Sequence, residues 1–205
     1  MSPLDTLGFA LGTSFASGLN LYLTVAAVGL FERFGIIHLP PQLQVLAHPI
    51  VLGVAVALFV IEFIADKIPY VDSVWDAVHT FIRPPAAALL SYSAFAGGVP
   101  EQWKIGAALL AGSVALTSHG AKATTRAAAN VSPEPVSNWS LSVGEDAIAV
   151  VLSWLAATHP IITAGIVVAL VILALFLIWR LFRFFRQVMS KFNRRPSGAE
   201  AAPAQ

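Results

Sequence analysis

The sequence predicts an all-α fold, a polytopic bundle of membrane helices with about six spans. Of its 205 residues, 57% are hydrophobic and 11% are charged, whereas soluble domains carry about 25% charged residues. The apolar residues are gathered in runs close to the roughly 20 residues that cross the hydrocarbon core of a bilayer. The length predicts one membrane domain, residues 1–195, followed by a disordered tail at 196–205 that is rich in alanine and proline.

Six segments are predicted to span the membrane: 7–31, 49–65, 72–96, 102–129, 141–158 and 160–179. The first contains Asn20, which requires a polar partner inside the bundle. Pro69 ends the second, and the pair Pro84-Pro85 interrupts the third, because proline lacks a backbone donor. The first apolar run has no basic residue before it and is too long for a cleaved signal, so we expect it to be retained as a helix.

The two halves of the chain show a weak internal repeat, with repeat one at 7–97 and repeat two at 102–190. The string LGTSFASGLNLY at 11–22 parallels AGSVALTSHGAK at 111–122, and each half continues with a proline-containing loop and a helix that ends in proline. Three crossings per half give the halves opposite orientations, as in many secondary transporters. The alternative is a chance similarity between apolar segments.

The stretch 62–85, EFIADKIPYVDSVWDAVHTFIRPP, concentrates ionisable residues between nearly uncharged runs. Positions three or four apart share a helix face, and a charge in the bilayer core is costly unless it is paired or hydrated. We therefore predict an ion or solute site formed by Glu62, Asp66, Asp72, Asp76 and His79. The predicted counter-charges and second-half partners are Arg83, His119, Lys122, Arg126, Glu134, Asn138, Glu145 and Asp146.

Two interpretations of these residues remain open. They form fixed ion pairs, such as Asp76 with Arg83 and Glu62 with Lys122, or they form an ion or proton path in which carboxylates and His79 exchange protons. The pattern Asp76-x-x-His79 resembles half of a bundle metal site, but no second pair accompanies it. We predict no firm metal site and no cofactor, although transient binding of divalent cations by the carboxylates stays open.

The C-terminal region is basic and carries no acid between residues 160 and 195. Its interleaved aromatic residues favour a helix at an anionic lipid surface. Positive residues mark the cytoplasmic side, so six spans predict a multi-pass inner-membrane protein with both termini in the cytoplasm. The net charge of +1 argues against a nucleic-acid partner. The predicted membrane-surface residues are Arg180, Arg183, Arg186, Lys191, Arg194 and Arg195.

Two strings together resemble an uncharacterised bacterial integral-membrane family that is known only as a domain of unknown function. They are E-F-x-A-D-K-I-P-x-x-D-S-x-W-D-x-x-H-T-x-I-R-P-P at 62–85 and S-P-E-P-x-S-N-W at 132–139. The resemblance covers about residues 8–186. It implies a multi-span inner-membrane protein and brings no established activity or functional residues.

The expected function is a small transporter or channel for a cation or a proton-coupled small solute, rather than an enzyme. The expected partners are the lipid bilayer, a cation or proton, and a second copy in a homodimer. One alternative is a scaffold that moves nothing, in which the charges are structural. Another is an enzyme acting on a lipid-linked substrate, with the acids binding a metal-pyrophosphate.

Overall fold

The computed structural model describes residues 2–68, 70–95, 99–130 and 135–192. Within these ranges the chain is helical and has no strand, so the predicted all-α class is confirmed. The predicted tail at 196–205 lies outside the described residues. The helices are α1 (Pro3–Leu19), α2 (Leu21–Arg33), the 3₁₀ helix η1 (Pro41–Ala47), α3 (Pro49–Ala65), α4 (Val71–His79), α5 (Arg83–Ala94), α6 (Glu101–Ala129), α7 (Pro135–Thr158) and α8 (Pro160–Phe192).

Proline and short polar residues set many of the helix starts. Ser2 and Asp5 form a reciprocal capping box at the start of α1. Proline occupies the first turn of α1, α3 and α5, where its missing donor costs nothing. Pro84 and Pro85 therefore lie inside the start of α5, and the predicted interruption falls just before them, between His79 and Arg83.

The chain reverses direction at Asn20. Its backbone is extended, and its side-chain Oδ1 accepts a 2.9 Å hydrogen bond from Leu23 N, which caps α2. Phe9 of α1 and Val28 of α2 belong to one core cluster, although a straight helix would separate them by about 28 Å. The two helices thus form an antiparallel hairpin, and the prediction of one continuous span over 7–31 is wrong.

Within the described ranges, two helices are long and apolar enough to cross a membrane, in the segments Val136–Thr158 and Pro160–Gln187. A third candidate is the pair η1 and α3, which bends by 62°. With 17 residues each, α1 and α3 reach only about 25 Å, and the C-terminal half of α6 carries His119, Lys122 and Arg126. The described residues therefore do not confirm about six spans.

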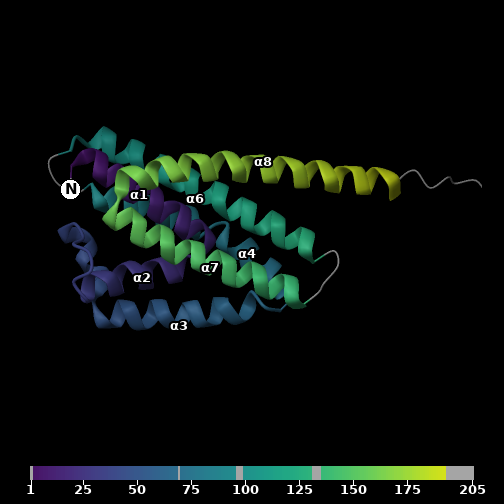
Figure 1. Cartoon of the computed structure of the whole chain (residues 1–205), viewed down its shortest axis with the longest axis horizontal. Coiled ribbons are helices and arrows are strands. Elements are labelled where there is room, and N and C mark those ends of the chain that lie inside the picture. Colours follow the sequence, from purple (N-terminus) through teal and green to yellow (C-terminus); the bar gives the residue numbers. More distant parts are fainter. Residues whose placement is uncertain (1, 69, 96–98, 131–134, 193–205) are drawn as a thin grey trace, which may run out of the picture.

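Helix α1 lies in the centre of the bundle, in contact with α5, α6, α7 and α8 (Figure 1). Small residues allow these close approaches. A Cβ on Gly8 would meet the Pro160 carbonyl, and one on Gly18 would meet Ser118 and the Ala115 carbonyl of α6. The start of α1 and the end of α8 lie at opposite ends of the bundle.

The structure does not display the predicted repeat at its first element. The alignment pairs Asn20 with Gly120, but the chain turns at Asn20 and continues as a helix through Gly120. The inverted repeat stays a prediction.

We expect Gly18→Ala to destabilise the fold by about 1–3 kcal/mol, because the added methyl group has no room between α1 and α6. Gly106→Ala is the matched control, since nothing lies within 4 Å of its Cβ position and alanine is the better helix former. The measurement is the thermal unfolding midpoint in detergent. Equal midpoints for the two variants would contradict the close packing at Gly18.

Candidate functional site

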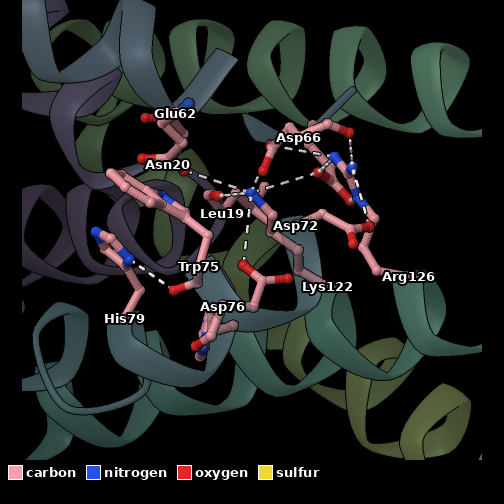
Figure 2. Close-up of polar contacts among 12 residues, drawn as sticks. Leu19, Asn20, Glu62, Asp66, Asp72, Trp75, Asp76, His79, Lys122 and Arg126 are labelled. Atoms are coloured by element: carbon pink, nitrogen blue, oxygen red, sulfur yellow. Dashed lines mark hydrogen bonds and ion pairs between the residues drawn. The ribbon is translucent and has the colours of Figure 1, made fainter. Parts of the chain in front are cut away.

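A cluster of charged side chains fills the region where the α1–α2 turn meets α3, α4, α5, α6 and α7 (Figure 2). Its side chains are 0–3% exposed, except that of Glu145 at 12%. Most of the site residues predicted from the sequence meet here. We call this group the charge cluster: Glu62, Asp66, Asp72, Asp76, Arg83, Lys122, Arg126 and Glu145.

The first half of the cluster joins α3 to α5 and α6. Arg83 Nη2 lies 2.5 Å from Glu62 Oε1, and Lys122 Nζ lies 2.9 Å from Asp66 Oδ2. Lys122 also approaches Glu62 Oε1 at 3.4 Å, so one ammonium group serves two acids. These short contacts are charge-assisted hydrogen bonds.

Arg126 extends the network to α7. Its Nη2 lies 2.6 Å from Glu145 Oε2 and 3.1 Å from Asp66 Oδ2. Three cations are thus matched by three acids, Glu62, Asp66 and Glu145, and the three pairs tie four helices together.

The same cations satisfy backbone carbonyls at helix ends. Arg83 Nη1 donates to Gly18 O at 2.8 Å, and Lys122 Nζ donates to Leu19 O at 3.1 Å. Both carbonyls belong to the last turn of α1, which has no intrahelical donor for them and carries the negative end of the helix dipole. The α1–α2 turn is therefore held in place by the charge cluster.

Asp72 is stabilised chiefly by neutral donors. Its Oδ1 accepts from Ser73 N at 2.6 Å and from Asn130 Nδ2 at 3.0 Å. Asn138 orients Asn130 with a 3.1 Å hydrogen bond to Asn130 Oδ1. Arg126 approaches Asp72 only at 4.0 Å.

Asp76 is left without a hydrogen bond at either carboxylate oxygen, although it is only 2% exposed. Its Oδ1 lies 3.7 Å from Arg83 Nη2 and 3.9 Å from Lys122 Nζ, too far for hydrogen bonds. Figure 2 shows its carboxyl group turned toward Lys122. Because Arg83 and Lys122 already bind Glu62 and Asp66, Asp76 is the acid of the cluster with the weakest compensation.

His119 and His79 have different roles. Arg83 Nη1 approaches His119 Nδ1 at 2.8 Å, and because arginine only donates, Nδ1 must accept and His119 is uncharged. His79 Nδ1 donates to Trp75 O at 2.8 Å, and its Nε2 lies 3.0 Å from the Tyr22 hydroxyl. Its described hydrogen bonds therefore lead to its own helix α4 and to α2 rather than to the carboxylates.

Two further residues lie beside the cluster. Asp146 Oδ1 accepts from Asn20 Nδ2 at 2.9 Å, which links α7 to the α1–α2 turn. Lys67 donates to Phe63 O and Ser142 Oγ, and burial lowers the pKa of Lys67.

Some predicted residues lie elsewhere. Glu134, Arg194 and Arg195 fall outside the described residues, and Lys191 is helical without a described side chain. The three arginines Arg180, Arg183 and Arg186 lie on the far part of α8. Among the described residues, no group of three or more His, Asp or Glu side chains is arranged to hold a metal ion.

Sequence reasoning missed two kinds of group. Asn20 and Asn130 were not among the predicted site residues, although an amide within an apolar helix and one at a helix end were visible signals. The carbonyl groups of Gly18 and Leu19 carry no side-chain signal, so the sequence gives no sign of their part in the cluster.

Fold and site together define an α-helical protein with helices apolar enough to cross a membrane and a buried charged centre. The chain belongs to the family described as Domain of unknown function (DUF4126), whose model matches residues 7–180. This match confirms the resemblance drawn from the sequence. No curated protein and no solved structure matches the chain.

We expect Glu62→Gln to destabilise the protein by about 3–5 kcal/mol, because it removes the shortest ion pair of Arg83 and leaves Asp76, 3.7 Å away, as its remaining acid. The matched control is Glu101→Gln, whose side chain is 57% exposed and lies 3.7 Å from Lys104. This control should change stability by less than about 1 kcal/mol. Unfolding in detergent measures both, and a loss in Glu62→Gln no larger than in the control would show that the pair is not a structural tie.

Proposed function

We propose that the protein is a small integral-membrane transporter in which Asp76 carries the coupling proton. The supporting observation is the carboxylate of Asp76 inside the charge cluster, which has no hydrogen bond and only two long ion-pair contacts, at 3.7 and 3.9 Å. An ionised carboxylate without a hydrogen bond is costly to bury, and such a group becomes neutral by binding a proton. A proton that binds there neutralises the site, and its release creates a buried charge that favours hydration or rearrangement.

The surroundings of Asp76 favour a proton over a metal cation. Hard metal ions bind carboxylate oxygens at roughly 2.0–2.6 Å. An ion at Asp76 Oδ1 would share that oxygen with Arg83 and Lys122, whose nitrogen atoms lie 3.7 and 3.9 Å from it. Coulomb repulsion between like charges at such distances is strong where water is excluded. A proton neutralises the oxygen without adding a third cationic centre.

Two interrupted helices support a transport role. The α1–α2 hairpin turns at Asn20, and the break between α4 and α5 falls between His79 and Arg83. Helix ends at membrane depth require polar partners, and discontinuous helices of this kind form the central sites of many secondary transporters. Here Arg83 and Lys122 bind both the acids and the end of α1, so a change of charge at Asp76 acts directly on the contacts that hold the hairpin.

The topology belongs to the same proposal. Because the α1–α2 hairpin returns to the side from which it starts, it removes one crossing from the six that place both termini in the cytoplasm. The basic end of α8 then marks the cytoplasmic face, and the start of α1, at the other end of the bundle, faces the opposite side. An inner-membrane location belongs to the proposal, whereas the crossing lost from the first half removes the argument for two inverted repeats.

We expect Asp76→Asn to keep the stability of the wild type and to abolish proton movement, because asparagine resembles a permanently protonated aspartate. The assay uses proteoliposomes that contain a pH-sensitive dye. A potassium diffusion potential drives protons, with sodium and magnesium salts tested outside in turn. Glu101→Gln is the control, since it removes an acid from an exposed pair. Proton flux through Asp76→Asn equal to that of the wild type would overturn the assignment.

A structural scaffold is the second candidate, and the dense ion pairs that link α3, α5, α6 and α7 favour it. Under this alternative, wild-type vesicles acidify no faster than protein-free vesicles. Asp76→Asn then lowers the unfolding midpoint, because its carboxylate contributes to holding Arg83 and Lys122. Stability and flux together therefore separate the two functions.

A further inference from the structure

Helix α8 changes character abruptly after Trp179. Its first 20 residues, Pro160–Trp179, contain no charged side chain, and their length of about 30 Å matches the hydrocarbon core of a bilayer. Val167 and Ala174 are buried against the bundle, and Ile178 contacts the Cβ position of Gly120 in α6. One face of α8 therefore packs on the protein, and this segment is long and apolar enough to span the apolar layer.

The residues that follow present arginine on the opposite side. Arg180, Arg183 and Arg186 are exposed and recur every third position. At about 100° per residue, Arg180 and Arg183 lie on the face of α8 away from Ala174 and Ile178, and Arg186 lies at the edge of that face, about 80° from Ile178. No acid occurs anywhere in α8, so their charge is uncompensated within the helix. Figure 1 shows this part of α8 continuing past the ends of α6 and α7.

The side chains around Trp179 are typical of the level at which lipid headgroups lie. Trp179 is 53% exposed, and Arg183 lies 5.5 Å from its ring in a cation–π contact. Exposed tryptophan is typical of the membrane–water interface. A surface hollow beside it is lined by polar and apolar groups, namely Arg180, Leu181, Arg183, Phe184 and Gln187. Such a lining suits a phosphate group and the first carbons of an acyl chain together.

We propose that this arginine face of α8 binds the headgroup phosphate of an anionic phospholipid. The charge of the face selects the ligand: a zwitterionic headgroup carries a compensating cation, whereas an anionic headgroup gives each arginine a net attraction. At a membrane surface, this attraction raises the affinity for anionic lipid roughly fivefold for each basic residue. The site is separate from the charge cluster and does not depend on the proposed transport of protons.

The test uses the full chain in neutral detergent. Because the sequence has no cysteine, Gln187→Cys gives a single attachment point for an environment-sensitive fluorophore beside the arginines. Short-chain phosphatidylglycerol, phosphatidylcholine and inorganic phosphate are titrated separately. We expect a saturable fluorescence change with phosphatidylglycerol only, weakened by added salt. A response of the same size to phosphatidylcholine, or to inorganic phosphate, would overturn the proposal.

Two variants with several substitutions each are compared for lipid binding. The variant Arg180→Gln, Arg183→Gln, Arg186→Gln should bind phosphatidylglycerol roughly a hundredfold more weakly. A variant with Arg33→Gln and Lys104→Gln removes two basic groups from the other end of the bundle and should bind as the parent does. Unfolding midpoints check that both are folded, and Asp76→Asn should keep the lipid response.

Net charge and self-association are distinguished from lipid binding by the same titrations. An equal loss of binding in the Arg33 and Lys104 variant would mean that net charge, and not this face, determines the response. A fluorescence change that depends on protein concentration without lipid would mean that a second copy of the chain covers the face. Either result rejects the anionic phospholipid as the occupant.

Discussion

The arrangement of the helices depends on how three buried cations are shared. Arg83, Lys122 and Arg126 compensate acids from α3 and α7, and the first two also receive the last carbonyls of α1. Removing one partner from such a network leaves a charge where water cannot reach it, which is far more costly than the pair itself is stabilising. The cations therefore determine how α1, α3 and α7 are placed, and Asp76 is the acid for which they leave the least compensation.

The same interactions stabilise the two helix interruptions, at Asn20 and before Arg83. A turn such as that at Asn20 leaves backbone carbonyls at the end of α1 without helical partners. Arg83 and Lys122 donate to these carbonyls, and Asp146 holds the side chain of Asn20. The break before Arg83 brings that guanidinium to the tip of the hairpin. A change in the protonation of Asp76 would alter the field at Arg83 and Lys122 together. It would thus reach the turn through contacts of less than 4 Å.

The all-α class and the gathering of Glu62, Asp66, Lys122 and Arg126 could be predicted from the sequence. Isolated charges in apolar helices must find one another, and their three- and four-residue spacings put them on single faces. The hairpin could not be predicted, because residues 7–31 have the length and composition of an ordinary span and Asn20 resembles a residue that joins helices.

The two ion pairs named from the sequence, Asp76 with Arg83 and Glu62 with Lys122, are present at 3.7 and 3.4 Å. The shortest partners could not be predicted, because Arg83 lies 2.5 Å from Glu62 and binds it in preference to Asp76. That choice depends on how α3 packs beside α5. The similarity between 11–22 and 111–122 did not show that the chain turns at Asn20 but continues as a helix through Gly120. Both segments are rich in small residues, which suit either conformation.

The central claim is that Asp76 holds a proton inside the bundle, and infrared spectroscopy of the reconstituted protein measures this directly. On acidification from neutral pH the wild type should gain the carbonyl-stretching band of a buried protonated carboxylic acid. This band should be missing from Asp76→Asn and unchanged in Glu101→Gln. A wild-type spectrum without such a band, or a band that persists in Asp76→Asn, would contradict the account.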